Sequence, residues 1–496
     1  MAQPESNERK WVLLLCLLAA MHVFVFSAAF PFFNNVDEQA HFDLVLKYSH
    51  GHIPRGLEPI STESAHYIII YGTSEYLEAP AHFPAGQFPP PLWTQAIQTT
   101  DPRLVAAVAA WHAETSFEVS QPPLYYALAG AWWNLGRACG FTGGHLLYWL
   151  KFLNVFFISA LVWLGFLAAR LVFPEQPFLR LGVPALLAFF PQAAFYSIQN
   201  DVLSPLCFGA AFICLVQLLR ADVPSARLGT ATGLALAAVF LTKISNLPLL
   251  AVAAAVVLFK IIFLAKSGTL RPAWPAMALL VLCAGLPVAG WLAWTKYHFG
   301  DFTGATAKIA FLGWTHKPFG EWWQHPIFTP QGLWTFASGV LATFWRGEFW
   351  WHYQPLAAPW MDFIYTVSSL GFVMVALITI GSPFNGAGGR RQALWLGFGC
   401  CLAAVAFLGF LSIIYDFGAC YYPSRAHPYF TSGRLMLGVL IPFSLLYLHG
   451  LDQVLQRVKS TWVRPLVLVV MILFMLITEI VTDWTAFSSQ YNWFHM

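Results

Sequence analysis

The eight residues that begin at Asn34, NNVDEQAH, gather two carboxylates and an imidazole directly after the first apolar run. In a helix, Asp37 and His41 lie four residues apart and share one face. A carboxylate held at a membrane surface can act as a general base or a metal ligand, so Asp37, Glu38 and His41 are the candidate catalytic residues. Alternatively, Asn34 or Asn35 caps a helix whose first turn carries the carboxylates, where the helix dipole favours anions.

Two further polar features could face this cluster. The run QPPLYY contains Pro122 and Tyr125, and its two prolines suit the first turn of a helix. This run is either the start of a surface helix or part of a binding site. Asn200 and Asp201 stand between two apolar runs. They form either a polar turn or a second acidic site that converges on Asp37.

Three cations are candidates for holding a phosphate. Lys243 lies within the last turn of an apolar run, where its side chain either snorkels to the interface or contacts a ligand. Arg434 opens a late apolar run, nine residues after Arg425. A cation at a helix N-terminus opposes the helix dipole, and a lipid phosphate, which suits the arginine fork, would compensate for that. A divalent cation, Mg or Mn, is left open, with Asp37 and Asp201 as its ligands.

The elements that position these residues are apolar runs. A membrane-spanning helix needs about 20 mostly apolar residues. Eleven runs come close to this length: Trp11–Phe30, Leu146–Arg170, Leu181–Gln199, Val202–Leu219, Leu228–Ser245, Leu247–Ala265, Trp274–Thr295, Phe363–Ile380, Leu394–Tyr415, Leu435–Leu448 and Val463–Val481. The sequence therefore predicts an all-α polytopic membrane protein with about eleven transmembrane helices.

The composition agrees with this fold class. Of the 496 residues, 58% are hydrophobic and 10% are charged, whereas about 25% are charged in a typical soluble domain. This composition excludes an ordinary soluble enzyme and a disordered chain, and the net charge of +3 gives no support to a nucleic-acid partner. Charges near the middle of the spans are almost absent by this interpretation, which favours chemistry at the membrane surface over transport.

Basic residues in the short loops set the orientation, because positive charge concentrates on the cytoplasmic side. With Arg9 and Lys10 in the cytoplasm, the N-terminus is cytoplasmic and the plasma (inner) membrane is the expected location. One transmembrane domain, residues 1–482, then precedes a tail at 483–496. Three extracytoplasmic loops follow at 31–145, 296–362 and 416–434, and the first is expected to carry surface helices at Asp101–Thr115 and Pro122–Gly136.

Together these motifs resemble the C-type (GT-C) membrane glycosyltransferases, which include protein O-mannosyltransferases and lipid A aminoarabinose transferases. The resemblance is carried by the acidic motif after the first span, the proline motif at Pro122, the outer turn at Asp201 and the SGR motif that ends at Arg434. These motifs occur in the expected order over residues 11–450, and the closest likeness is to uncharacterised bacterial relatives. The second acidic turn is not a DxD motif, which leaves a metal requirement in doubt.

The resemblance implies an inverting transfer of a hexose or pentose from a polyprenyl-phosphate carrier to a glycan, lipid or protein outside the cytoplasm. It assigns the role of base to Asp37, with Glu38 beside it, and it places Pro122, Tyr125 and Asp201 in the same cavity. The phosphate is then held by Lys243 and Arg434. Two other hypotheses remain open, a transporter or flippase of a lipid-linked precursor and a non-catalytic assembly subunit. The chain has no P-loop, HExxH or GxSxG motif that would suggest another enzyme.

Overall fold

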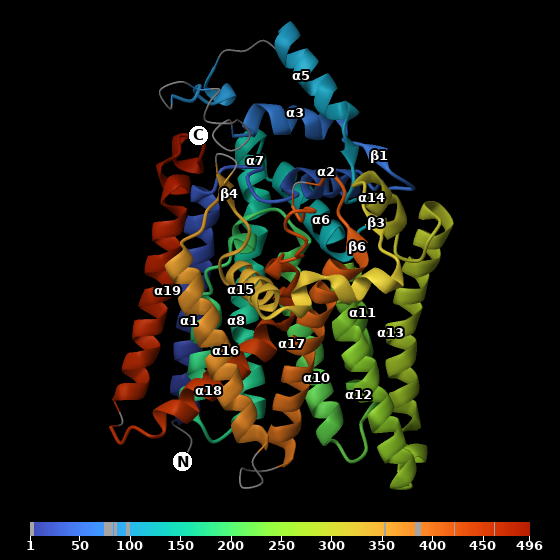
Figure 1. The fold of residues 1–496 in the computed structure, drawn as a ribbon, viewed down its shortest axis with the longest axis vertical. Helices are drawn as coiled ribbons and strands as arrows, with labels where there is room; N and C mark the ends of the chain where they lie inside the picture. The colour runs from blue at the N-terminus through green and yellow to red at the C-terminus, as the bar shows by residue number, and fades with distance from the viewer. Residues whose placement is uncertain are drawn as a thin grey trace.

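Long helices run side by side along the longest axis of the molecule (Figure 1). The computed structural model describes residues 4–73, 83, 87–95, 100–351, 354–381, 388–420, 422–460 and 462–496. The N-terminus lies at one end of the helix bundle and the C-terminus at the other (Figure 1). Termini at opposite ends require an odd number of crossings.

Nine helical segments of the described chain are long and apolar enough to cross a membrane, so the prediction of an all-α polytopic membrane protein is confirmed. Each coincides with one of the expected runs. They are α1 (Pro4–Ala29), α7 (Gly143–Lys151) with α8 (Leu153–Val172), α10 (Ser204–Arg220), α12 (Leu247–Lys266), α13 (Leu270–Phe299), α16 (Pro359–Gly381), α17 (Gly388–Ile414), the 3₁₀ helix η9 (Gly433–Val439) with α18 (Leu440–Leu455), and α19 (Val463–Ser488).

The two other expected runs form shorter apolar helices, α9 (Pro177–Ala188) and α11 (Ala226–Thr242). The expectation that the helix continues to Gln199 is wrong. Pro191 lacks a backbone N–H and disfavours helical conformation in the residue before it, and α9 ends just ahead of it. The chain then forms buried 3₁₀ turns, η4 (Ala193–Tyr196) and η5 (Asn200–Leu203). Non-helical backbone is tolerated at membrane depth only where protein surrounds it or lines a cavity.

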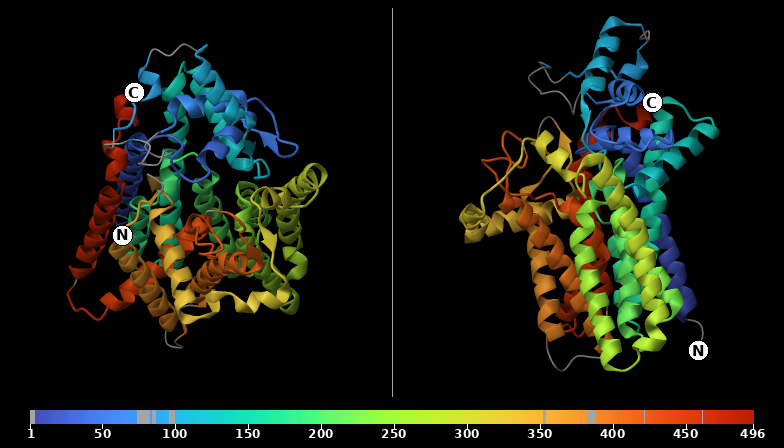
Figure 2. Two further views of the ribbon diagram at one scale, coloured as in Figure 1. Left: turned by 45° about the horizontal axis from the view of Figure 1, so that its top comes forward. Right: turned by 90° about the vertical axis from the view of Figure 1, so that its right-hand side faces the viewer.

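A layer of short helices covers the end of the bundle opposite the N-terminus, which we call the capped end (Figures 1 and 2). The expected surface helices are present there as α5 and α6, within two residues of the expected bounds. The layer consists of α2 (Glu38–Ser49), α3 (Thr62–Tyr71), α5 (Pro102–Ala113), α6 (Leu124–Ala138), the 3₁₀ helix η3 (Leu92–Thr94) and an antiparallel pair, β1 (Glu58–Pro59) with β2 (Thr115–Ser116).

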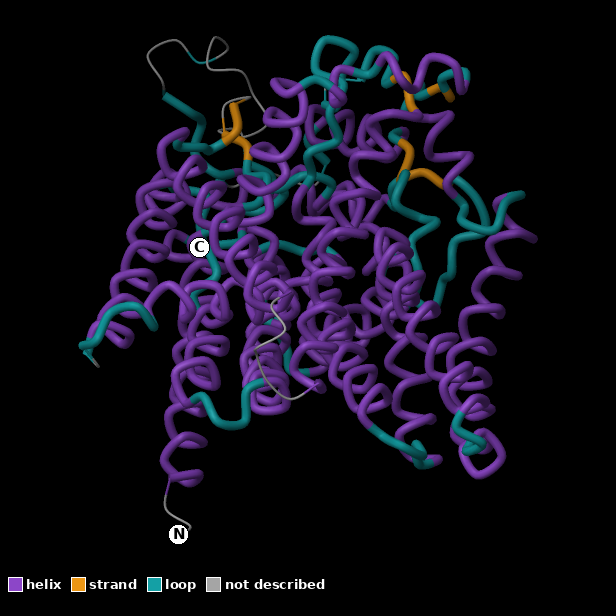
Figure 3. Tube along the Cα trace, turned by 60° about the horizontal axis from the view of Figure 1, so that its bottom comes forward, coloured by secondary structure: helices purple, strands orange, loops and turns teal. Residues whose placement is uncertain are grey.

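The two later loops also contain regular structure. Two more antiparallel strand pairs of two residues each lie here, drawn in orange in Figure 3. The elements are α14 (Ala305–Phe311), α15 (Pro330–Arg346), the 3₁₀ helices η7 (Phe319–Gln324) and η8 (Pro326–Phe328), β3 (Thr315–His316) with β6 (Tyr415–Asp416), and β4 (Trp350–Trp351) with β5 (Gln354–Pro355). The tail expected from residue 483 is shorter than predicted, because α19 continues to Ser488 before η10 (Trp493–His495).

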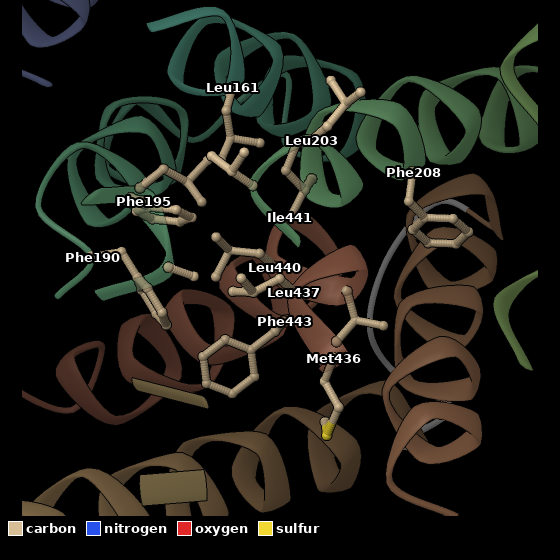
Figure 4. Close-up of a cluster of buried hydrophobic side chains, with 14 of the residues drawn as sticks. Leu161, Phe190, Phe195, Leu203, Phe208, Met436, Leu437, Leu440, Ile441 and Phe443 are labelled. Carbon is tan, nitrogen blue, oxygen red and sulfur yellow. The ribbon is translucent and has the colours of Figure 1, made fainter. Parts of the chain in front are cut away.

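A continuous apolar core joins the elements beneath the capped end (Figure 4). Leu437 and Ile441, from η9 and α18, lie among side chains of α8, α10 and the 190–203 segment, such as Leu161 and Phe195. Burial of each such side chain is worth about 1.5–3 kcal/mol relative to exposure. The core therefore fixes η9 beside η5, and these two 3₁₀ helices carry Arg434 and Asp201.

Candidate functional site

Asp37 occupies a strained position at the start of α2. Its backbone has φ 66° and ψ 5°, the left-handed conformation that non-glycine residues rarely adopt. Asp37 is itself the N-cap residue, but its side chain makes no capping hydrogen bond. The capping alternative at Asn34 or Asn35 is therefore wrong. Strain of this kind is typical of functional positions and persists only where the surroundings enforce it.

Arg434 pairs with Asp37 and helps to hold it in this position. The guanidinium of Arg434 connects segments that are far apart in the chain. Its Nη2 donates to Oδ2 of Asp37 at 2.7 Å, and its Nε donates to Oε2 of Glu348 at 2.7 Å. Its Nη1 donates to Oε1 of Gln199 at 2.8 Å and to Oδ2 of Asp201 at 3.3 Å. We call Asp37, Asp201, Lys243, Glu348 and Arg434 the Arg434 cluster.

Local sequence explains how Arg434 reaches this position. Gly433 N donates to the hydroxyl of Thr343 in α15 at 2.8 Å, and Ser432 donates to Glu348 at 2.8 Å. A Cβ on Gly433 would collide with the backbone of α15 at Val340 and Phe344. Only glycine allows η9 to approach the backbone of α15 so closely. The SGR motif therefore packs η9 against α15 and directs the side chain of Arg434 towards the carboxylates.

Lys243 completes the cluster from the end of α11. It follows the last helical residue rather than lying within the last turn, and its Nζ donates to Oδ2 of Asp201 at 2.5 Å. Two cations thus face three carboxylates, a formal charge of −1. The sequence singled out four of these residues, and the structure adds Glu348 to them.

Few donors of the Arg434 cluster remain for a ligand. A guanidinium has five N–H donors and an ammonium three. Four of the five on Arg434 are used, and one of the three on Lys243 is used. Within the described part of the chain, one N–H of Arg434 and two of Lys243 have no protein acceptor. The cations therefore serve mainly to hold carboxylates, with three donors left over.

Exposure separates Asp37 from the other carboxylates of the cluster. Its side chain is 25% exposed, against 1% for Asp201 and 5% for Glu348. Asp37 lines a cavity of about 330 Å³ with Gln39, Trp111 and Phe311 among its walls. Of these three carboxylates, Asp37 is the one that a bound molecule could reach through this cavity.

A second cavity, of about 630 Å³, borders the cluster on the side of Glu348. Its walls come from α15, α16 and the chain before η9. They combine apolar side chains with a few polar ones, including Trp334, Arg346, Glu348, Phe363, Tyr422 and His427. Arg346 is already paired with Asp362 at 3.0 Å. The guanidinium of Arg434 thus contacts one carboxylate from each of the two cavities.

Glu38 has a structural position. It is fully buried, and its two oxygens accept the backbone N–H groups of Phe33, at 3.0 Å, and Ile198, at 2.9 Å. Burial raises the pKa of Glu38, although Lys151, 4.0 Å away, opposes the shift. These bonds connect the strained turn before Asp37 to the 190–203 segment. Glu38 therefore positions its neighbours and is not accessible to a substrate.

His41 lies behind Asp37, in contact with the start of α6. Its Nδ1 is 2.7 Å from the hydroxyl of Tyr126. Burial lowers the pKa of His41 to about 4, against the opposing charge of Glu118. The imidazole is therefore neutral at pH 7, and it is suited to hold Tyr126 rather than to carry charge.

The sequence interpretation missed Glu118. Its side chain is buried, pairs with Lys308 and accepts from Gln121 at 2.7 Å. Burial alone would raise the pKa of Glu118, but the charge and hydrogen bond of Lys308 and the charge of Lys243 outweigh burial and hold the pKa well below its ordinary value. Glu118 lies three residues before the first residue of the QPPLYY motif. This position was the one feature of the sequence that could have pointed to it.

The remaining predicted residues fall into two groups. Pro122 and Tyr125 are buried at the entry of α6, and Asn200 donates to the carbonyl of Thr242 at 3.1 Å, so all three lie near the cluster as supports. Arg425 does not join them. Its side chain is 70% exposed and pairs with Asp416 at 2.9 Å, because the segment around it folds onto the β3–β6 pair.

The geometry does not fit a divalent cation between Asp37 and Asp201. Arg434 bridges these two carboxylates and occupies the place that a metal ion would take. Among the residues that the structure describes, no group of three or more His, Cys, Asp or Glu side chains could hold a metal ion.

The spans contain buried ionisable groups, contrary to the expectation that such charges are almost absent. Glu479 of α19 accepts from Tyr196 and lies 2.8 Å from Nε2 of His22 in α1. Asp483 is buried one turn further along α19. We call His22, Tyr196, Glu479 and Asp483 the Glu479 cluster. The sequence interpretation overlooked it because its members come from three separate segments.

The fold and the described residues define an α-helical protein that crosses a membrane several times. The chain belongs to the family described as "Predicted membrane protein (DUF2142)", whose model matches residues 18–416. The matched region contains Asp37, Asp201, Lys243 and Glu348, whereas Arg434 follows it. No curated protein matches the chain.

Proposed function

We propose that this protein is a glycosyltransferase that moves a sugar from a polyprenyl-phosphate donor to an acceptor hydroxyl at the capped end. The observation that carries the proposal is the half-buried carboxylate of Asp37. It is strained, ionically fixed by Arg434 and open to a cavity of about 330 Å³. A carboxylate held in this way is suited to act as a general base.

In the proposed reaction Asp37 takes the proton of the acceptor hydroxyl while the hydroxyl oxygen attacks the anomeric carbon of the donor. The bond from that carbon to the phosphate oxygen breaks with inversion, and the polyprenyl phosphate leaves with the electron pair. The leaving group is already anionic and needs cations rather than a proton. The three free N–H donors of Arg434 and Lys243 would supply them.

The two cavities suit the two substrates. The cavity at Glu348 is larger and is bordered by α16, a candidate membrane span, so its apolar wall would take the prenyl end of the donor. The cavity at Asp37 would take the acceptor. Since Arg434 contacts a carboxylate of each cavity, the sugar would be transferred beside its guanidinium. With a cytoplasmic N-terminus, as the basic loops predict, the transfer would occur on the extracytoplasmic face of the plasma membrane.

A test uses the purified protein with polyprenyl-phosphate-linked hexose and pentose donors and follows release of polyprenyl phosphate. The Asp37→Asn variant should lose about 10²–10⁴-fold in rate, the usual contribution of a general base. Asp416→Asn is the matched control, because Asp416 also pairs with an arginine but lies outside the cluster. Transfer by Asp37→Asn at the rate of the wild type would refute the role of Asp37.

A second candidate function is transport of a lipid-linked precursor across the membrane. The Glu479 cluster favours it, because ionisable groups buried in spans often mark substrate or proton pathways. The two functions are separable. A flippase would move a fluorescent lipid-linked sugar across proteoliposome membranes without consuming it, and a transferase would release the lipid phosphate.

A further inference from the structure

A groove at the end of the bundle that holds the N-terminus has the features of a lipid site. It has a volume of about 730 Å³ and lies between α10, α12 and α17. All three helices are candidate spans and run side by side (Figure 1). Because no part of this groove belongs to the Arg434 cluster or its cavities, it is independent of the proposed transfer.

The walls of the groove are apolar. Leu219 of α10, Val256 and Phe259 of α12, and Leu396 and Gly399 of α17 line it. The side chain of Phe259 is 58% exposed, as expected for a surface that faces hydrocarbon. An acyl chain is the ligand that such a membrane-facing groove would take.

One end of the groove is polar and cationic. Arg391 and Gln392 lie in the first turns of α17, beside the last turn of α10. Both side chains are exposed, and in the described part of the chain no residue forms an ion pair or hydrogen bond with the guanidinium of Arg391. Trp395, one turn further along, is typical of the membrane interface.

We propose that this groove binds one anionic phospholipid, with an acyl chain against α12 and the phosphate on Arg391. The charge argues for an anionic headgroup. Arg390 and Arg391 both stand at the N-terminal end of α17, where the helix dipole disfavours cations. A phosphate would relieve this repulsion, and a basic pocket between transmembrane helices is the usual form of an anionic lipid site.

The test is native mass spectrometry of the full-length protein after exchange into an equal mixture of phosphatidylglycerol and phosphatidylcholine. The wild type should retain one phosphatidylglycerol, with a preference of about fivefold over phosphatidylcholine, the effect of one arginine near a phosphate. Arg391→Gln should abolish the preference. Arg271→Gln is the control, because Arg271 is also exposed and lies in the first turn of another span, α13.

A second pair of variants tests the groove itself. A Cβ on Gly399 meets no atom within 4 Å, so Gly399→Leu fills the groove without disturbing the backbone and should abolish retention of the lipid. Gly290→Leu, at an equally open position in α13, should have no effect. Unchanged retention by Gly399→Leu, or equal loss of preference in Arg391→Gln and Arg271→Gln, would overturn the proposal.

Discussion

The Arg434 cluster and the Glu479 cluster are both buried and both link distant segments, but they differ in access. A cavity of about 330 Å³ reaches Asp37 in the first, whereas the space beside Glu479 and Asp483 is about 10 Å³. The smaller space has room for about one water molecule. Burial of charge alone therefore does not identify a site, since both clusters have it. The combination of an ionically fixed carboxylate with an open cavity is what separates Asp37 from Glu479.

The clusters also differ in charge. Three carboxylates of the Arg434 cluster depend on one guanidinium and one ammonium, whereas the hydrogen bonds of the Glu479 cluster come from a tyrosine and a histidine. Loss of a cation that holds several buried carboxylates leaves uncompensated charge. Loss of one charge between hydrogen-bonding partners leaves most contacts in place. The two clusters should therefore respond very differently to substitution.

The largest loss of stability is expected for Arg434→Met. Removal of one partner from a buried ion pair typically costs about 3–5 kcal/mol, and here the guanidinium has three carboxylate partners. The melting temperature of the purified variant should fall sharply. Arg425→Met is the control and should leave the melting temperature almost unchanged, because that pair is exposed to solvent. Equal losses in the two variants would contradict the central place of Arg434.

A smaller effect on stability, visible as a dependence on pH, is expected from the neutral state of His41. Its pKa in the folded protein is about 4, below its ordinary value of 6.5. Between these values the unfolded chain binds a proton that the folded protein does not, so stability falls as the pH drops from 6.5 towards 4. This contribution amounts to about 2 kcal/mol between pH 7 and pH 5.

The measurement compares the pH dependence of the melting temperature in the wild type and in His41→Gln. The variant should lose less stability than the wild type on acidification. Glu38 contributes in the opposite direction, because its raised pKa favours proton binding by the folded state at low pH. That contribution is common to both proteins and cancels in the comparison. Parallel curves for the two proteins would show that His41 is not buried in neutral form.

The smallest effect is expected for Glu479→Gln, which keeps the shape of the side chain and an acceptor for Tyr196. Loss of charge from these hydrogen bonds should cost about 1 kcal/mol of stability. Sugar transfer should change by less than about twofold if the two clusters act independently. A loss of transfer as large as that of Asp37→Asn would contradict this independence and show that the two clusters act in one mechanism.

The sequence was sufficient for features that depend on local pattern. Apolar length predicts the spans, and polar residues at the ends of these runs single out Asp37, Asp201, Lys243 and Arg434. Pattern failed where three-dimensional packing decides. Arg425 lies close to Arg434 in sequence but on the exposed β3–β6 side. Distances along the chain cannot reveal this difference in burial.

The residues that the sequence missed have partners far along the chain. Glu348 meets Arg434 across 86 positions, Glu118 meets Lys308 across 190, and His22 meets Glu479 across 457. Only Glu118 had a local signal, its place before the proline motif, because the burial of all these residues follows from how the helices pack. The break at Pro191 is a different case, since a proline signal was present and the apolar run around it concealed it.

The most direct test of the central claim compares the envelope glycans of cells by mass spectrometry. Cells that lack the protein should lose one hexose or pentose from a glycan, lipid or protein of the envelope. Expression of the wild type or of Asp416→Asn should restore it, and expression of Asp37→Asn at the same level should not. An unchanged glycan profile without the protein, or full restoration by Asp37→Asn, would contradict sugar transfer with Asp37 as the base.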